Sequence, residues 1–295
     1  MRVAYLGPPG TNSHAALVAA GGDAGAVGLA DVGAVVRAVQ AGEAARGLVP
    51  VENSREGVVA ATLDSLVFDA PDVVITGELV HRVSYGLVAA VPIAVGEVAT
   101  VHSHPQATGQ CARFLAARLP DAAVMPAGST AGAVRAVAEG AGLAGRPPHA
   151  AIGTLHAAAL YGAAVLAERI EDDPDNATRF AWLTRAAAAD PAARAVGSAA
   201  AAADQWKTAL VFWGGGDLVP GWLVECLACF SSRSINLTRI ESRPRRIGLG
   251  HYMFFVDLEG GAGDPDVAAA IADLRGRCEA VRVLGSFPAA APAAA

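Results

Sequence analysis

Four short polar regions of the sequence carry the side chains that could do chemistry. They lie at residues 7–11, 52–57, 103–106 together with 129–130, and 176–180. These regions supply hydroxyls, amides and candidate helix N-termini, and their obvious cation is Arg179. Backbone amides at a helix N-terminus favour an anion. The set therefore fits a small anionic ligand, and carboxylates suit it better than a nucleotide.

The basic residues exclude several classes of protein. Lys207 is the only lysine among 22 basic residues. Schiff-base chemistry needs a lysine amine, and a Walker A loop needs a lysine after its glycines. Lys207 has neither context. The net charge of −6 gives no indication of the basic patch that nucleic-acid binding requires.

The composition also favours a cytoplasmic protein. The mean hydropathy is +0.39, but much of the apolar excess is alanine, and no run of about 18 strongly apolar residues predicts a membrane span. The four cysteines are scattered, which is typical of reduced thiols. His102 and His104 alternate without an evident third ligand, so we expect no metal site.

The polar side chains also have simpler structural explanations. Serine and threonine that follow a strand are most often helix N-caps. That explanation applies to Thr11, Ser129 and Thr130. His104, before Pro105, fits an ordinary loop residue as well as a functional one.

Strand and helix patterns alternate through the first 161 residues. We expect strands at 3–7, 46–51, 73–75, 83–90, 98–101, 122–125 and 150–153, and helices at 11–20, 31–41, 105–119, 129–139 and 154–161. This alternation predicts an α/β fold with parallel sheets. Ligands of such sheets bind beyond the carboxyl ends of the strands. We therefore interpret all four polar regions, 176–180 included, as loops there.

The last third of the chain predicts a second kind of domain. Residues 186–206 are alanine-rich and predict a linker. Strands are expected at 208–213, 235–241, 251–258 and 280–284, with helices at 221–233 and 265–277. This β-α-β-β-α-β order is ferredoxin-like. Residues 289–295, rich in alanine and proline, predict a disordered tail.

Taken together, these motifs resemble the prephenate dehydratase family. The matching segments are residues 5–11, 49–57, 103–107, 129–130, 150–153, 176–180 and 235–244. Each segment is weak alone, but their order and spacing are highly specific. The resemblance implies a two-lobed catalytic region over 1–185, similar to periplasmic binding proteins, and a C-terminal ACT regulatory domain over 207–288. One lobe would comprise 1–76 and 164–185, and the other 77–163.

The resemblance also implies a reaction and its residues. The family converts prephenate to phenylpyruvate, water and carbon dioxide without a metal or organic cofactor. Thr178 would donate a hydrogen bond to the departing hydroxyl. Arg179 would pair with a carboxylate or brace its loop, and Phe180 would pack where the lobes join. The residues expected to bind substrate are Thr11, Asn53, Ser54, Ser103, Gln106, Ser129, Thr130 and Asn176. Glu52 and Glu56 suit a dianion less well, because like charges repel.

The family's ACT domain binds phenylalanine at an interface between subunits, so we also expect a homodimer or homotetramer. The matching positions are Gly221, Trp222, Leu223, Val224, Asn236, Glu241, Ser242, Arg243 and Pro244. Where the family usually has Gly-Ala-Leu-Val, this chain has a tryptophan at the second position. The Trp222 indole could enter the effector pocket, narrow it, or turn toward a subunit interface.

Two other functions stay open at this point. The chain could be a two-lobed sensor of an aromatic acid, since fold does not fix function. Thr178-Arg179-Phe180 together with Asn53-Ser54 favours an enzyme instead. The second alternative is arogenate dehydratase, in which an amino group of the substrate replaces the keto group. Competing rates on the two substrates would distinguish them.

Overall fold

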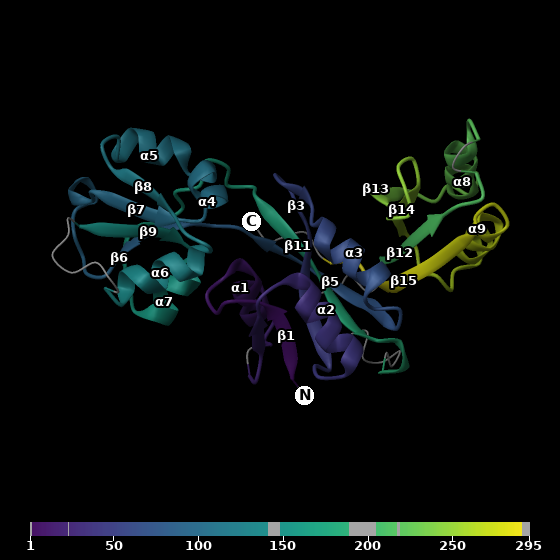
Figure 1. Cartoon of the computed structure of the whole chain (residues 1–295), viewed down its shortest axis with the longest axis horizontal. Coiled ribbons are helices and arrows are strands. Elements are labelled where there is room, and N and C mark those ends of the chain that lie inside the picture. The colour runs from purple at the N-terminus through teal and green to yellow at the C-terminus, as the bar shows by residue number, and fades with distance from the viewer. Residues whose placement is uncertain (1, 23, 141–147, 189–204, 217–218, 291–295) are drawn as a thin grey trace.

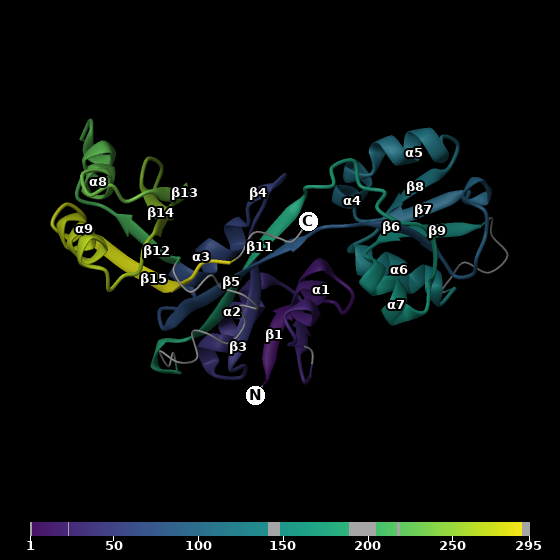
Figure 2. The ribbon, with the colours of Figure 1, turned by 180° about the vertical axis from the view of Figure 1, so that it is seen from behind.

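The described part of the chain folds into two lobes and a C-terminal domain. The computed structural model describes residues 2–22, 24–140, 148–188, 205–216 and 219–290. Figure 1 shows the first lobe at the centre, the second lobe on one side and the C-terminal domain on the other, and the view from behind in Figure 2 agrees. The α/β architecture with a ferredoxin-like C-terminal domain is confirmed.

The first lobe is built on a mixed sheet with the strand order β5-β11-β3-β1-β2. Its strands are β1 (Val3–Leu6), β2 (Val27–Leu29), β3 (Arg46–Asn53), β4 (Gly57–Val58), β5 (Val73–Arg82) and β11 (Ala177–Arg185). Its helices are α1 (Asn12–Ala19), α2 (Val32–Ala41) and α3 (Ala60–Phe68). One buried cluster joins α1 to Phe180 and Trp182, and another joins α2 and α3 to Ala181 and Leu183. The two faces of β11 therefore pack against different helices.

The second lobe has its own sheet, in the order β10-β6-β9-β7-β8. The strands are β6 (Gly86–Ala89), β7 (Thr100–Ser103), β8 (Ala123–Pro126), β9 (His149–Gly153) and β10 (Ala164–Ala167). The helices are α4 (Pro105–Gln110), α5 (Ala112–Arg118), α6 (Thr130–Ala138) and α7 (Leu155–Tyr161), with a 3₁₀ turn at Val95–Glu97. Small buried residues such as Ala151 and Ala157 let α6 and α7 pack closely on this sheet.

Two long strands connect the lobes, and they correct two sequence-based expectations. β5 leads out of the first lobe and β11 returns, paired antiparallel with both β5 and β3. The sheets are therefore mixed rather than parallel. Residues 177–180 belong to a strand, not to a loop, because Thr, Phe and Trp suit a strand and both neighbours satisfy its backbone.

The sheets also divide the chain at different residues from the expected lobe boundaries of 76 and 164. β5 stays in the first sheet as far as Arg82. β10 pairs with β6 in the second sheet, and the chain re-enters the first sheet only at Ala177.

The C-terminal domain has the predicted β-α-β-β-α-β order. Its elements are β12 (Trp206–Trp213), α8 (Trp222–Ser231), β13 (Leu237–Pro244), β14 (Tyr252–Glu259), α9 (Pro265–Arg275) and β15 (Ala280–Pro288), with the sheet order β13-β14-β12-β15. A 3₁₀ turn, Ala186–Ala188, opens the expected linker. The rest of that linker through residue 204, and residues 291–295 of the expected tail, lie outside the described residues.

The C-terminal sheet continues into the first lobe. β15 pairs with β5 at Gly285 and Ile75, and a Cβ on Gly285 would overlap the Ile75 carbonyl oxygen, so this approach requires glycine. The Arg282 guanidinium donates to the carbonyl oxygens of Leu66, Ala70 and Val73 at 2.7–3.0 Å. These contacts satisfy carbonyl groups at and beyond the C-terminal end of α3 and fix the C-terminal domain to the first lobe.

Candidate active site

Thr178 and Asn53 lie side by side on neighbouring strands of the first sheet. They are paired residues of β11 and β3, and the Asn53 Nδ2 group donates to Thr178 Oγ1 at 3.0 Å. Thr178 is only 8% exposed. The hydroxyl thus sits in a fixed position at the end of the strand that connects the lobes.

The turn after β3 determines which way the Asn53 amide points. Its Oδ1 accepts from the backbone amides of Arg55 at 2.9 Å and Glu56 at 3.1 Å. Those donors require an oxygen there, so the amide nitrogen must face Thr178. Thr178 Oγ1 therefore acts as an acceptor toward Asn53, and its own O–H proton stays available for another acceptor.

Asn176 and Ser54 complete this cluster. Asn53 Nδ2 also lies 2.9 Å from Asn176 Oδ1, and Ser54 Oγ donates to the same oxygen at 3.3 Å. Asn176 Nδ2 in turn donates to Gln110 Oε1, on α4 of the second lobe, at 2.9 Å. Four predicted site residues, Asn53, Ser54, Asn176 and Thr178, are thus brought together, and a residue of the second lobe joins them.

Sequence reasoning missed Gln110, although it lies one helical turn after Gln106 on α4. Its side chain also donates to Glu56 Oε1 at 3.3 Å, so it contacts two of the polar regions. Gln106 itself is exposed, and no side-chain hydrogen bond is found for it among the described residues. The repeat of glutamine at i and i+4 was the available signal.

Several residues predicted to bind substrate also hold the local fold. Thr11 and Ser129 are N-caps, accepting from the amides of His14 and Gly132 respectively. Thr130 begins α6. Ser103 is fully buried, and its hydroxyl donates to the Ile152 carbonyl at 2.8 Å, which ties the end of β7 to β9. The cap explanation given for Thr11 and Ser129 matches their contacts.

Arg179 lies on the opposite face of β11 and is enclosed by three carboxylates. Its nitrogens donate to Glu52 at 2.9 Å, Glu78 at 3.1 Å and Asp257 at 2.7 Å. Burial works against the charge of the guanidinium, but the nearby carboxylates outweigh it and raise the pKa of Arg179. Of the two roles expected for Arg179, these contacts match bracing rather than substrate pairing.

Phe180, expected to pack where the lobes join, lies on the connecting strand β11 and packs inside the first lobe. Its side chain is 1% exposed and lies in a cluster with Tyr5, Leu48 and Trp182. The Phe180 side chain therefore supports the first lobe on the face of β11 that packs against α1.

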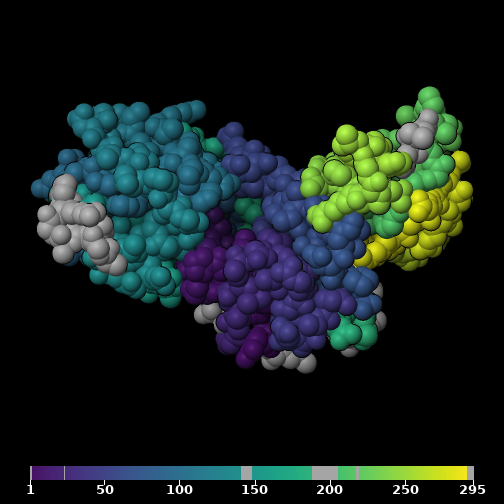
Figure 3. Space-filling model, in the orientation of Figure 1, coloured from purple at the N-terminus to yellow at the C-terminus, as the bar shows by residue number. Residues whose placement is uncertain are grey.

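The two lobes also contact each other through the loop and helix that follow β1. Thr154 Oγ1 donates to the Gly10 carbonyl at 2.9 Å, and the Asn12 amide donates to the Tyr85 hydroxyl at 3.4 Å. The ring nitrogens His14 Nδ1 and His156 Nε2 lie 2.9 Å apart. The space-filling view shows the surface hollowed where the lobes meet (Figure 3).

His81 is a further residue that the sequence did not single out. It pairs with Thr178 across β5 and β11. Burial lowers the pKa of His81, and the charge of His156 lowers it further. A mostly neutral imidazole therefore lies in the strand position beside Thr178.

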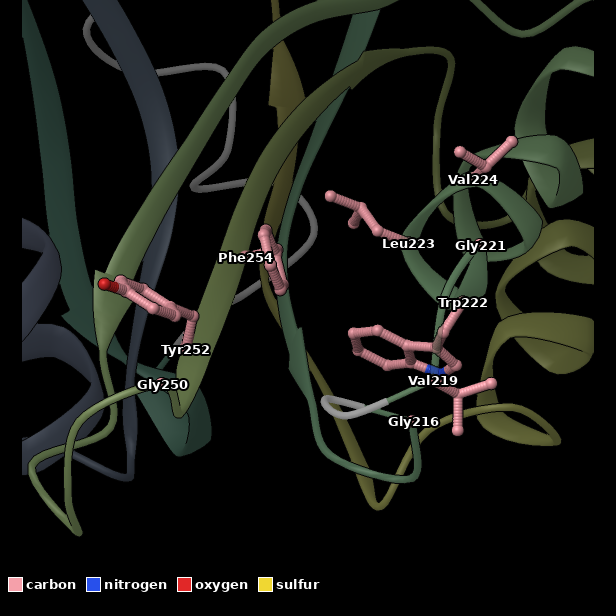
Figure 4. A pocket seen from close by; sticks show the side chains of 9 residues that line it. All are labelled: Gly216, Val219, Gly221, Trp222, Leu223, Val224, Gly250, Tyr252 and Phe254. Atoms are coloured by element: carbon pink, nitrogen blue, oxygen red, sulfur yellow. The ribbon is translucent and has the colours of Figure 1, made fainter.

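A separate pocket of about 190 Å³ lies in the C-terminal domain, between the start of α8 and strand β14 (Figure 4). Its lining residues are Gly216, Val219, Gly221, Trp222, Leu223, Val224, Gly250, Tyr252 and Phe254. Four predicted effector residues, 221–224, are among them. Gly221 has φ +88°, a conformation that favours glycine, so it can begin α8 with its backbone open to the pocket.

The indole of Trp222 is turned largely into the domain. It is 8% exposed and packs against Phe212 and Phe254, and its Nε1 donates to the Arg277 carbonyl at 2.9 Å. The indole forms part of the pocket wall, and these contacts hold it in place. The tryptophan therefore shapes the pocket from the core side.

The other predicted effector residues are not among those that line this pocket. Asn236 donates to Glu259, and residues 241–244 belong to β13 at the edge of the sheet. Arg243 makes a two-point contact with Asp64 of α3, at 3.1 and 2.9 Å. This predicted pocket residue joins the C-terminal domain to the first lobe, while Glu241, Ser242 and Pro244 continue the same edge strand.

Two α/β lobes that meet around hydroxyls and amides define a two-lobed class of α/β protein, and the boundary between domains is a preferred place for small-molecule sites. None of the helices in the described ranges has the length and apolar character of a membrane span.

Comparison with known proteins gives the family. Residues 3–188 match the family model for prephenate dehydratase. A prephenate dehydratase of Mycolicibacterium vanbaalenii is 40% identical, over 97% of this chain and 90% of the relative. The chain belongs to the prephenate dehydratase family.

Solved structures resemble the whole chain. The prephenate dehydratase of Arthrobacter aurescens, in complex with L-Phe, has a TM-score of 0.84 and 36% identity, covering 99% of this chain and 90% of that one. GqqA, described as a novel type of quorum quenching acylase, has a TM-score of 0.81 and 26% identity, covering 99% of both chains. The fold thus extends to proteins with differently named activities.

Proposed function

We propose that this protein converts prephenate to phenylpyruvate, water and carbon dioxide, and that phenylalanine inhibits it through the C-terminal domain, which is an ACT domain. The observation that carries the catalytic part is the Asn53–Thr178 hydrogen bond, because the fixed amide leaves the Thr178 proton free to donate. The effector part is supported by the aromatic pocket and by the L-Phe complex of the Arthrobacter relative.

In the proposed step, the bond between the ring and its carboxylate breaks and carbon dioxide leaves. The electron pair enters the ring and expels the hydroxyl group as hydroxide, which takes up a proton from solvent and becomes water. Thr178 donates a hydrogen bond to that oxygen as negative charge develops on it. A threonine is a weak acid, so stabilisation by a hydrogen bond that strengthens in the transition state describes its part best.

The carboxylates of the substrate are held by neutral donors in this account. Arg179 is already bound by Glu52, Glu78 and Asp257. Hydroxyls, side-chain amides and the backbone amides at the N-terminus of α1 remain to bind a dianion. Holding the substrate in a reactive geometry can supply roughly 7–11 kcal/mol of such a barrier.

The proposed effector site takes the phenyl ring of phenylalanine between Leu223 and Phe254. Figure 4 shows these two side chains projecting toward each other from α8 and β14. The pocket is lined mainly by apolar side chains, which suits the ring. A second copy of the chain, associating along the edge strand β13, would cover the open side and make the protein a homo-oligomer.

The experiment is a turnover assay of the purified protein with prephenate, following phenylpyruvate with and without phenylalanine. Turnover that phenylalanine suppresses supports both parts. Turnover without inhibition would remove the effector part, and absence of turnover would remove the catalytic part. Competing rates with arogenate decide which substrate the enzyme prefers.

A further inference from the structure

A cluster of six charged side chains lies where the first lobe meets the C-terminal domain. The first lobe contributes Arg179, Glu52 and Glu78, and the C-terminal domain contributes Asp257, Arg239 and Lys207. Three cations and three anions give a formal charge of zero. The side chains of Glu78 and Asp257 are only 1% and 2% exposed, so each of these two carboxylates depends on its partners.

Asp257 joins the two domains within this cluster, as the Lys207–Glu78 pair at 2.9 Å also does. Its carboxylate accepts two bonds from Arg239, both at 2.8 Å, and one from Arg179 at 2.7 Å. Burial by itself would raise the pKa of Asp257, but the Arg239 and Arg179 contacts outweigh burial and lower it. Asp257 is therefore a charged anchor that lies on β14, outside the family's catalytic region.

Asp257 binds Arg179, the residue that follows Thr178 on β11 and points to the opposite face. Successive residues of a strand point to opposite faces, so Thr178 faces Asn53 while Arg179 faces the ion cluster. The pairing of β11 with β3 shifts register between Arg179 and Phe180 and skips Val51 of β3, as in a β-bulge of β3. Bulges re-aim side chains and are common beside active sites. The irregularity thus lies in β3, directly opposite Arg179, the residue that Asp257 holds.

We propose that Asp257 is a positioning residue for Thr178, acting through Arg179. The C-terminal domain then completes the active site from behind instead of only carrying an effector. Arg239, the other partner of Asp257, lies on β13 two residues before Glu241. Displacement of β13 relative to the first lobe would therefore reach Thr178 through two ion pairs. This inference rests on the proposed function of Thr178.

The test compares Asp257→Asn with Asp64→Asn in the full chain. Asp64 is the matched control because it also accepts two bonds from one arginine and one from another, Arg243 and Arg246, at the same domain boundary. Asp257→Asn is expected to lower kcat about 10- to 100-fold with little change in KM, since small misplacements of reacting groups cost on the order of 10²-fold. Asp64→Asn is expected to keep kcat within about twofold, because the Asp64 carboxylate contacts Arg243 and Arg246 and not β11.

Two further measurements separate positioning from general destabilisation. Arg179→Gln combined with Asp257→Asn is expected to be no slower than Arg179→Gln alone, because Asp257 acts through Arg179. Hydrogen exchange of the amides of residues 177–180 is expected to quicken in Asp257→Asn and not in Asp64→Asn. If Asp257→Asn folds poorly, Asp257→Glu, which keeps the charge and shifts it by one methylene, is measured in its place, and an intermediate kcat is expected.

Wild-type kcat in Asp257→Asn, or multiplying losses in the double variant, would overturn the inference. Failure of the proposed function is distinguishable, because it appears as absent turnover in the wild-type protein. The exchange measurement decides the role of Asp257 in that case: unchanged protection of residues 177–180 would overturn it.

Discussion

The Asn53 side-chain amide donates to Thr178 Oγ1, while its carbonyl oxygen is held by two backbone amides of the following turn. One residue thus sets the direction of another residue's hydroxyl proton. A threonine hydroxyl that already accepts a hydrogen bond from the neighbouring strand can direct its own proton toward a substrate. This polarity is what a group that assists a departing hydroxyl requires.

The first prediction concerns Asn53→Asp. An aspartate keeps an oxygen for the amides of Arg55 and Glu56, so the turn should survive. Its second oxygen accepts instead of donating, so it draws the Thr178 proton away from the substrate. We expect kcat to fall about 10²- to 10³-fold, the loss typical of removing such a donor. The thermal unfolding midpoint should fall as well, because Asn176 Oδ1 and the Ala177 carbonyl lose the same donor.

Asn53→Ala is the comparison for that variant. It removes the acceptor of the turn as well as the donor to Thr178, so it should lose both activity and stability, the latter by about 1–3 kcal/mol. Equal activity of Asn53→Asp and wild type would contradict the assigned polarity.

The second prediction concerns the join between β5 and β15. Gly285→Ala places a methyl group against the Ile75 carbonyl, and overpacking of this kind costs about 1–3 kcal/mol. Gly263→Ala, where no atom lies within 4 Å of the added Cβ, is the matched control. Denaturant unfolding should show a loss for Gly285→Ala alone. Matching losses in both variants would argue against a close approach at Gly285.

The third prediction concerns Trp222. Trp222→Ala removes a core indole and should destabilise the protein by about 3–5 kcal/mol. Trp222→Phe keeps an aromatic wall but leaves the Arg277 carbonyl without its donor, a loss of about 1–3 kcal/mol. Calorimetric titration should show phenylalanine binding to Trp222→Phe and much weaker binding to Trp222→Ala. Unchanged binding by both variants would place the effector elsewhere.

The fourth prediction concerns pH. Burial lowers the pKa of His81 in the folded protein, and the His156 charge adds to this, whereas the unfolded value is about 6.5. The unfolded state therefore takes up the proton first as the pH falls. The stability that neutral His81 contributes is complete above pH of about 6.5 and is lost below it. Thermal unfolding between pH 5 and 7.5 should show a smaller loss for His81→Gln than for the wild type. Parallel curves would contradict this.

The sequence predicted the kind of fold better than the path of the chain through it. The C-terminal element order followed from local periodicity, which neighbouring residues determine. Residues 176–180 were interpreted as a loop because Asn176, Thr178 and Arg179 are polar, and the partners that make 177–185 a strand, β3 and β5, are about 100 residues or more away. Pairing at that distance leaves no local signal.

The site shows the same division. Asn53, Ser54, Asn176 and Thr178 were identified by type and motif, and the structure brings them together. Whether Arg179 faced the substrate or the protein depended on which side of β11 it occupied. It also depended on Asp257, a residue of another domain. Gln110 and His81 also lie beside site residues that are distant in the sequence, Asn176 and Thr178 respectively. Local sequence therefore gave little sign of them.

The most direct measurement is the turnover of prephenate by Thr178→Ala, beside Thr178→Ser and Thr178→Val. We expect Thr178→Ser to keep a substantial part of kcat, because the hydroxyl remains. Alanine and valine should lose about 10²- to 10³-fold, although valine preserves the shape of the side chain. Near-normal turnover by Thr178→Val in a folded protein would contradict the role given to the Thr178 hydroxyl.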